Sequence, residues 1–321
     1  MLNFEPISLD KQELYHKYFS ITPEQSADYT FMNLLGLKDI YMLEWAFTEK
    51  LVWIRQKSPY TIYWAPVGDW FNANFCDGFN PCEISGESII RIPKELALFW
   101  EKTTKIKVKE ARDEWEYLYD FNELVALSGK KFHNKKNLYN QFIKNEFEYK
   151  LIDNNIVKDI IDFEIKWQEE EKKNNAVSDD SNSSTEECET FESKKLLSHE
   201  IRAEADTIMI KTFLNNWDMI DNIIGGAIYI DKSIAAYTIA DLSMRDTIVI
   251  HSERGDRNYK GSYQAINKMF LENLKNSIND YEKFKFVNRE QDVGDLGLRK
   301  AKMSYNPIGY IEKYKGFCTD F

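Results

Sequence analysis

The C-terminal segment 288–307 brings many ionisable side chains, two glycines and a tyrosine into one short stretch, directly after the strand-like run 284–287. A surface loop does not need this mixture, whereas a strand that ends at a cleft and leads into a helix does. Carboxylates placed there can take a proton from a reacting group, and Arg binds carboxylate or phosphate in a bidentate manner. The candidate ligand-holding cations are Arg289, Arg299 and Lys302. The alternative is an internal ion-pair network that fixes the helix to the sheet.

Two further cationic stretches precede this segment. Residues 128–137 carry a glycine and four lysines immediately before and at a predicted helix start, in a chain whose net charge is −11. Such cations favour a phosphate ligand, from a coenzyme or from the acceptor end of a transfer RNA; the alternative is that the lysines only solvate the helix start. The four lysines are Lys130, Lys131, Lys135 and Lys136. Residues 253–263 carry Arg254, Arg257 and Lys260 ahead of another predicted helix.

Composition limits the function classes. The chain has 321 residues, 43% of them apolar, which suffices for two domains with packed cores. No apolar run approaches the roughly 20 residues of a membrane span, and the N-terminus lacks the pattern of a signal peptide, so we expect a soluble, cytoplasmic protein. The net charge argues against non-specific binding to nucleic acid or to an anionic membrane. Four cysteines and four histidines are scattered, so we expect no metal site.

One polar segment divides the chain. Residues 168–195 are rich in Glu, Asp, Ser and Asn, with few apolar residues and no period. Such a stretch buries too little surface to offset its ordering entropy, which predicts a flexible linker or insertion. We therefore predict an N-terminal domain at 1–167 and a C-terminal domain at 196–321.

The first part predicts two helices and a three-stranded meander, followed by a helix, a strand and a helix. Ser26 is the predicted cap of the second helix. The predicted elements are helices at 9–18 and 26–35, strands at 42–48, 51–57 and 61–67, a helix at 94–103, a strand at 115–119 and a helix at 136–148.

The second part repeats this theme as helix, three meandering strands, helix, strand, helix and strand. The predicted bounds are 200–215, 225–231, 234–242, 246–251, 262–276, 284–288, 296–302 and 309–314. This is the element order of the GNAT acyltransferase fold, and the first part gives a looser version of it. We therefore predict the α+β class, with two tandem GNAT-like domains, each a mixed, largely antiparallel sheet flanked by helices. A generic pair of α+β domains is the alternative.

The chain also resembles a known family, the soluble proteins related to the catalytic, C-terminal domain of phosphatidylglycerol lysyltransferases, which is a tandem of two GNAT-like halves. The matching segments are 28–34, 113–120, 127–137, 246–251, 260–267 and 288–307, and they span most of the chain in the expected order. Residues 240–245 depart from the run found in relatives. The resemblance is to the branch without an assigned substrate.

The GNAT fold implies a place for an acyl carrier. Its pyrophosphate binds backbone N–H groups where the fourth strand meets a helix, and residues 253–263 are the equivalent loop. Gly261 fits the glycine of the usual signature Gln/Arg-x-x-Gly-x-Gly/Ala, whereas Asn258 replaces its first residue and Tyr263 its last small one. Arg254, Arg257 and Lys260 of this loop are the candidate cations that bind the phosphate. The alternative is that the loop is only solvated. Residues 128–137, after the strand at 115–119, are the predicted counterpart in the first half.

The GNAT fold also implies catalytic roles in the C-terminal segment. Tyr305 is the candidate acid that protonates the leaving group, and Glu290 and Asp292 are the candidate bases that take the proton of the acceptor. These roles predict direct attack on a thioester or aminoacyl ester, without a covalent enzyme intermediate.

Three functions remain open. The resemblance favours a transferase that moves an acyl or aminoacyl group from acyl-coenzyme A or aminoacyl-transfer RNA to an amine or hydroxyl, with no tightly bound cofactor. The net charge favours the smaller carrier over transfer RNA. The alternatives are a non-catalytic ligand-binding protein that keeps the tandem fold, and a protein whose cleft serves assembly with a partner. The sequence specifies no oligomeric state.

Overall fold

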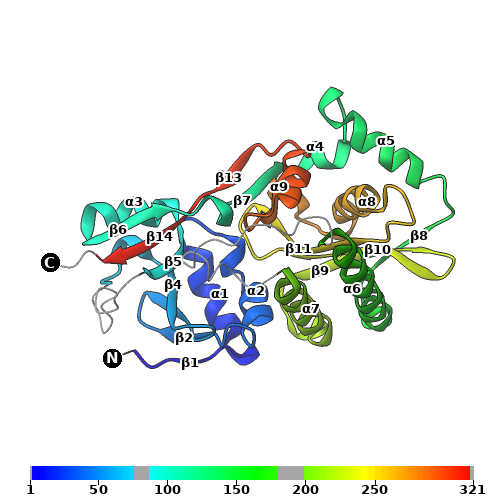
Figure 1. Ribbon diagram of the computed structural model, residues 1–321. Helices are drawn as coiled ribbons and strands as arrows, with labels where there is room; N and C mark the ends of the chain where they lie inside the picture. The colour runs from blue at the N-terminus through cyan, green and yellow to red at the C-terminus, as the bar shows by residue number, and fades with distance from the viewer. Residues whose placement is uncertain (1, 76–86, 180–198, 319–321) are drawn as a thin grey trace.

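The computed structural model describes residues 2–75, 87–179 and 199–318, which form two mixed, seven-stranded sheets flanked by helices (Figure 1). The first sheet has the order β1 (Glu5–Pro6), β2 (Glu44–Phe47), β3 (Leu51–Gln56), β4 (Ile62–Gly68), β5 (Glu87–Pro93), β14 (Lys313–Cys318) and β6 (Ile106–Glu110). The second has the order β13 (Gly309–Ile311), β7 (Glu116–Asp120), β12 (Phe286–Gln291), β11 (Thr247–Gly255), β10 (Ser233–Asp241), β9 (Ile223–Ile230) and β8 (Glu148–Leu151). The predicted α+β class, with two mixed, largely antiparallel sheets flanked by helices, is confirmed.

Each sheet is antiparallel except for one parallel pair, β4–β5 in the first sheet and β11–β12 in the second. The meanders form because their strands alternate with tight turns. Asp231 and Lys232 both have positive φ, 49° and 66°, and join β9 to β10 as a two-residue hairpin. Two residues in this conformation match the right-handed twist of the flanking strands.

The two halves exchange strands. β14, from the C-terminal end of the chain, lies between β5 and β6 in the first sheet, and β7 lies between β12 and β13 in the second (Figure 1). The predicted last strand, 309–314, is therefore two strands in different sheets. The predicted domains at 1–167 and 196–321 stay a prediction. Each of the two sheets contains strands from both of these ranges.

Helices cover the faces of both sheets. α1 (Gln12–Ile21), α2 (Phe31–Leu37) and α3 (Lys94–Thr103) belong to the first sheet. The second sheet carries α4 (Phe121–Ala126), α5 (His133–Phe142), α8 (Ser262–Ser277) and α9 (Leu296–Met303) on one side, and α6 (Val157–Asp179) and α7 (His199–Asn215) on the other (Figure 1). Helix α6 takes in residues 168–179 of the predicted linker, and residues 180–198 lie outside the described part of the chain.

One helix begins differently from the prediction. Thr30 caps α2 by accepting a hydrogen bond from the backbone N–H of Asn33 at 3.2 Å. Ser26, the predicted cap, instead donates to Glu116 Oε1 at 2.7 Å. The difference arises because Glu116 is a buried carboxylate that requires donors.

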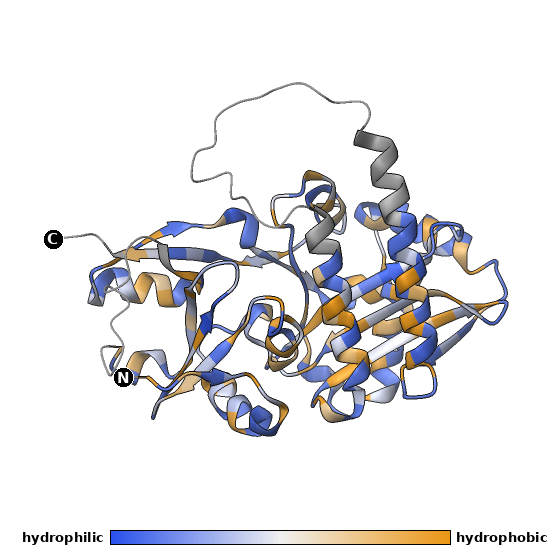
Figure 2. Ribbon diagram, turned by 60° about the horizontal axis from the view of Figure 1, so that its bottom comes forward, coloured by the Kyte–Doolittle hydropathy of each residue, from blue (hydrophilic) through white to orange (hydrophobic). Residues whose placement is uncertain are grey.

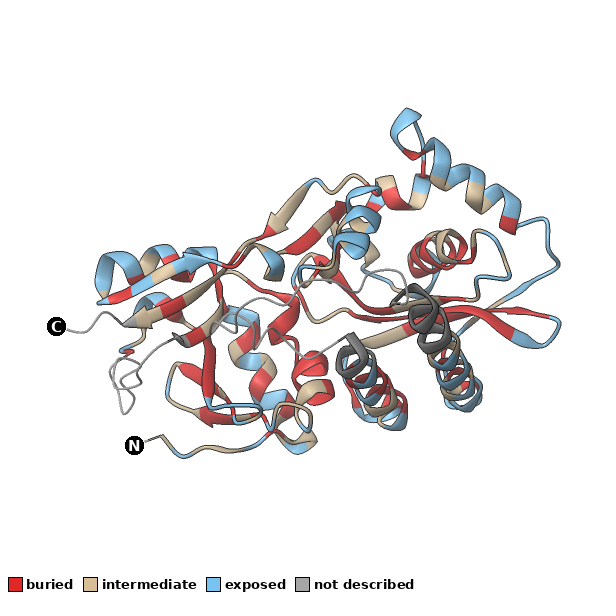
Figure 3. Ribbon diagram, in the orientation of Figure 1, coloured by how far each residue is buried: buried red, intermediate tan, exposed pale blue. Residues whose placement is uncertain are grey.

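The hydrophobic core is continuous from one half to the other. Apolar residues gather on the strands of the second sheet and on the helices that cross it (Figure 2), and buried residues follow both sheets and α2 (Figure 3). The halves meet where α2 packs on α7. A Cβ atom on Gly36 would lie 2.4 Å from Met209 Cγ, so glycine permits this close approach. No helix in the described ranges has both the length and the hydropathy needed to cross a membrane.

Candidate functional site

The parallel strands β11 and β12 separate at their C-terminal ends. They pair only from Thr247–Phe286 to Val249–Asn288, whereas β11 continues to Gly255 and β12 to Gln291. The unpaired ends lie between the helices that cover the two faces of the second sheet. Charged side chains from both strands point to opposite faces at this level, and they form two groups.

The first group lies on the face covered by α8 and α9, and we name Lys135, Arg289 and Lys302 the cationic cluster. Arg289 stacks on the ring of Tyr305 at 4.6 Å from its centroid, and Lys135 Nζ lies 4.0 Å from the same centroid. Lys302 Nζ donates to the backbone carbonyl of Arg289. Glu253 on β11 accepts from Arg289 Nη2 at 2.6 Å. Three of the predicted binding residues and the predicted acid therefore lie together.

Electrostatics in this cluster favour loss of protons from the lysines. Burial, followed by repulsion from Arg289, lowers the pKa of both Lys135 and Lys302 to about 8. Burial raises the pKa of Tyr305, although Arg289 opposes this, so its hydroxyl is protonated at neutral pH. That hydroxyl accepts a hydrogen bond from Gln264 Nε2 at 3.1 Å.

The second group lies on the α7 face and centres on His251. Ser252 pairs with Ile239 and Ile250 with Ala240, so His251 is an extra residue in β11. This bulge turns the imidazole toward Phe213 of α7, and its Nδ1 lies 2.7 Å from Glu290 Oε1.

The imidazole bridges both halves of the protein. Its Nε2 lies 3.8 Å from Asp241 Oδ2 and 3.3 Å from Thr30 Oγ1 at the start of α2. Burial favours the neutral ring, but the neighbouring carboxylates of Asp241 and Glu290 raise the pKa of His251 to about 9. The histidine is thus a buried cation between two carboxylates.

Glu290 is held in an unusual backbone conformation. Its φ is 55°, within a shift of register between β12 and β7. A non-glycine residue in this region costs about 1–3 kcal/mol and persists only where the surroundings impose it. Here the backbone N–H donates to Asn288 Oδ1 at 2.8 Å and the carboxylate contacts His251. The predicted base is therefore oriented from both its backbone and its side chain.

Asp292 lies apart from both groups. Arg299 donates to its two oxygens at 2.8 Å each, Tyr117 donates to Oδ2 at 2.5 Å and the N–H of Gly294 donates to Oδ1 at 2.9 Å. Burial opposes ionisation, but these hydrogen bonds, from Arg299 foremost, lower the pKa of Asp292 to about 2. Arg299 also binds Asp113 at 2.7 Å. These contacts fix α9 to β7, and a carboxylate so paired accepts protons weakly at neutral pH; the catalytic role of Asp292 and the binding role of Arg299 stay predictions.

The predicted phosphate loop 253–263 has mixed contacts. Arg254 lies 3.6 Å from Glu164 of α6 and donates to Asp206 of α7 at 3.2 Å, so it fastens both helices to the sheet. Gly261 has φ 91°, and a Cβ there would lie 2.1 Å from the carbonyl oxygen of Leu138, because α5 crosses the start of α8. Arg257, Asn258 and Lys260 are exposed. Phosphate binding by this loop stays a prediction.

The lysine-rich segment is placed differently from the prediction. The preceding strand, β7, belongs to the second sheet, so the segment is no counterpart within the first half. It leads into α5, which packs on α8. Lys131 binds Glu123 at 2.6 Å, and Lys130 and Lys136 are exposed, whereas Lys135 joins the cationic cluster.

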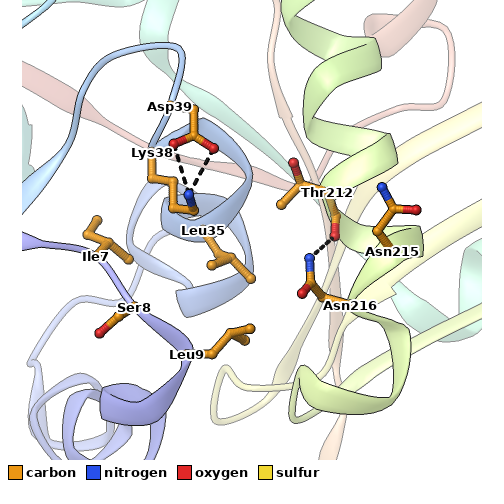
Figure 4. A pocket seen from close by; sticks show the side chains of 9 residues that line it. All are labelled: Ile7, Ser8, Leu9, Leu35, Lys38, Asp39, Thr212, Asn215 and Asn216. Carbon is orange, nitrogen blue, oxygen red and sulfur yellow. Dashed lines mark hydrogen bonds and ion pairs between the residues drawn. The ribbon is translucent and has the colours of Figure 1, made fainter.

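A pocket of about 450 Å³ opens elsewhere between the halves (Figure 4). It lies between the end of α2 and the end of α7, and Lys38 binds Asp39 on its wall while Asn216 donates to the carbonyl of Thr212 (Figure 4). Its lining contains none of the predicted site residues. Because its charged groups neutralise each other, we place the candidate site at the separated strands.

Metal ligands do not cluster in the described ranges, where no three His, Cys, Asp or Glu side chains are arranged to hold an ion. Cys76, Cys82 and Cys188 lie outside those ranges.

Sequence reasoning missed His251, Asp241 and Glu253 as members of the site. His251 ends the predicted strand 246–251. The signal that could have indicated His251 is the group of ionisable residues His251, Glu253 and Arg254 at the end of an otherwise apolar strand.

Comparison with known proteins gives a family and a fold. The family model for phosphatidylglycerol lysyltransferase, C-terminal, matches residues 19–316. A protein of unknown function from Bacteroides thetaiotaomicron is 23% identical, with a TM-score of 0.80 over 99% of this chain and 100% of that one. L-PGS from Bacillus licheniformis is 12% identical, with a TM-score of 0.60 over 99% and 94% of the two chains. FemX is 9% identical, with a TM-score of 0.57 over 99% and 98%. A comparison with curated proteins finds no match.

Proposed function

Because the chain belongs to the phosphatidylglycerol lysyltransferase C-terminal family, we propose that it transfers an acyl or aminoacyl group to an amine or hydroxyl. The observation that carries this proposal is the placement of Glu290, paired with buried His251, at the separated ends of β11 and β12. The cationic cluster and Tyr305 lie on the opposite face of the same strands. This arrangement suits a reaction in which donor and acceptor approach from different faces.

The proposed step is direct attack of the acceptor on the carbonyl carbon of a thioester or ester. A new C–N or C–O bond forms, and the C–S or C–O bond to the carrier breaks. Glu290 accepts the proton of the acceptor, and Tyr305 returns a proton to the leaving thiolate or alkoxide. His251 positions Glu290 through the 2.7 Å contact. Both acyl-coenzyme A and aminoacyl-transfer RNA fit this chemistry, and the net charge of −11 favours the smaller donor.

Replacement of Glu290 by Gln tests the proposed base. Purified protein is incubated with acyl-coenzyme A compounds or aminoacyl-transfer RNAs and a panel of amines and alcohols, and products are followed by mass spectrometry. We expect Glu290→Gln to lower the rate of transfer about 10²–10⁴-fold, which is the usual contribution of a general base. Exposed Glu282 provides the matched control, and Glu282→Gln should keep the wild-type rate. Transfer by Glu290→Gln at the wild-type rate would exclude Glu290 as the base.

A non-catalytic binding protein is the second candidate. The close contact between Gly261 and the carbonyl of Leu138 favours it, because α5 covers part of the loop that holds a carrier in the GNAT fold. Binding of a donor without any transferred product, in the same panel, would support this candidate over the transferase.

A further inference from the structure

We propose that the cationic cluster of Lys135, Arg289 and Lys302 binds a dianionic phosphate group, and that this binding takes up a proton. The proposal is independent of the transfer reaction, because a phosphate site requires only these side chains. The three cations come from α5, β12 and α9, and each residue is half-buried.

The cluster has more positive charge than its own carboxylates neutralise. Glu253 accepts from Arg289 at 2.6 Å, and Asn267 Nδ2 donates to the other oxygen of Glu253 at 3.2 Å, which holds this carboxylate in place. Glu290 and Asp292 lie near enough to raise the pKa of Lys302, but each carboxylate is bound by another cation, Glu290 by His251 and Asp292 by Arg299. The other aromatic and amide neighbours are uncharged side chains: Tyr117 and Tyr119 of β7, Gln264 of α8 and Tyr305.

The net positive charge of the cluster distinguishes between dianionic and monoanionic ligands. Three cations and one paired carboxylate leave two positive charges without a partner of their own. A phosphate monoester carries about two negative charges at neutral pH and matches them. A carboxylate or a phosphate diester, which is the group that links the nucleotides of RNA, carries only one. Arg289 supplies a planar donor group and the two lysines supply point charges, which is the combination found where phosphate is held.

The coupling between phosphate binding and proton uptake follows from the surroundings of Lys135 and Lys302. Burial and repulsion from Arg289 place the pKa of Lys135 and of Lys302 at about 8, so near pH 8 each is neutral in about half of the molecules. A bound dianion favours the charged form of both lysines. Binding at pH 8 should therefore take up about one proton per phosphate, shared between them.

Isothermal titration at pH 8.0, in two buffers with different ionisation enthalpies, tests both parts of the proposal. The probes are inorganic phosphate, methyl phosphate, dimethyl phosphate and acetate. We expect the two dianions to bind at least 10-fold more tightly than the two monoanions, with uptake of about one proton. Binding of dimethyl phosphate or acetate as tightly as methyl phosphate would overturn the assignment, as would no binding of either dianion at tens of millimolar.

Variants connect this binding to the cluster. Lys135→Met and Lys302→Met should each weaken phosphate binding at least 10-fold, and the double variant should take up no proton. Lys144→Met, which removes an exposed lysine just after α5, is the control and should bind as the wild type does. Lys135→Met relieves repulsion, so its melting temperature should be unchanged or higher, which separates lost binding from lost folding. Wild-type phosphate affinity in a folded Lys135→Met/Lys302→Met protein would overturn the proposal.

Discussion

Replacing Lys313 by Met is expected to lower the free energy of unfolding by about 3–5 kcal/mol, the usual result of removing one partner from a buried ion pair. Lys313 is fully buried, and its Nζ lies 2.6 Å from Asp28 Oδ2 and 2.6 Å from Glu116 Oε1. Both carboxylates are buried as well. Without the ammonium group, the buried charge of Glu116 is stabilised only by neutral hydrogen-bond donors, among them Ser26 and Asn288.

The effect is large because Lys313 joins the two sheets. It begins β14 of the first sheet, whereas Glu116 begins β7 of the second. The measurement is urea unfolding followed by tryptophan fluorescence. Lys94→Met is the control, because Lys94 forms an exposed pair with Glu312 and its loss should leave the unfolding midpoint unchanged. A Lys313→Met protein that unfolds within about 1 kcal/mol of the wild type would contradict a role for this ion pair in joining the sheets.

The contribution of His251 to the free energy of unfolding is expected to fall by about 1.5 kcal/mol between pH 6.5 and pH 8. The folded protein keeps the imidazole protonated up to a pKa of about 9, whereas the unfolded chain releases this proton near 6.5. The contribution is therefore fully present below pH 6.5 and is lost as the pH rises toward 9. From about pH 7 upward, Lys135 and Lys302 act in the opposite direction, since their pKa values of about 8 lie below the 10.5 of an unfolded lysine.

Urea unfolding of wild type and His251→Gln across this range isolates the histidine. The difference in the free energy of unfolding between wild type and variant should shrink by about 1.5 kcal/mol from pH 6.5 to pH 8, and at pH 6.5 the variant should be the less stable protein. His133→Gln, which removes an exposed histidine, should keep the wild-type slope. Equal slopes for wild type and His251→Gln would show that the buried imidazole does not gain a proton on folding.

The elements could be predicted from the sequence because their signals are local. The three strands of each meander and the helices at 94–103 and 262–276 follow from periodicity and turn residues. The exchange of β7 and β14 could not be predicted in this way. A strand pattern specifies which face is buried, whereas the partner strand depends on contacts about 200 residues away, such as Lys313 with Glu116.

For the candidate site, too, residues close together in the sequence could be predicted, whereas contacts between distant residues could not. The charged segment 288–307 indicated Arg289, Glu290, Lys302 and Tyr305, which do lie at the separated strands. The pairing of Glu290 with His251 depends on a bulge in β11, which leaves no signal in sequence spacing. Likewise, four neighbouring lysines look equivalent in the sequence, and only the packing of α5 distinguishes Lys135 from the other three.

The central claim is that the separated ends of β11 and β12 hold a charged histidine against the carboxylate that serves as base. The most direct measurement is an NMR titration of the ¹⁵N-labelled imidazole groups, with the signal of His251 identified by its loss in His251→Gln. We predict that both ring nitrogens of His251 are protonated at pH 7.5, that the group titrates near pH 9, and that Glu290→Gln moves this midpoint down. A neutral His251 at pH 7.5, or a midpoint that Glu290→Gln leaves unchanged, would contradict the account.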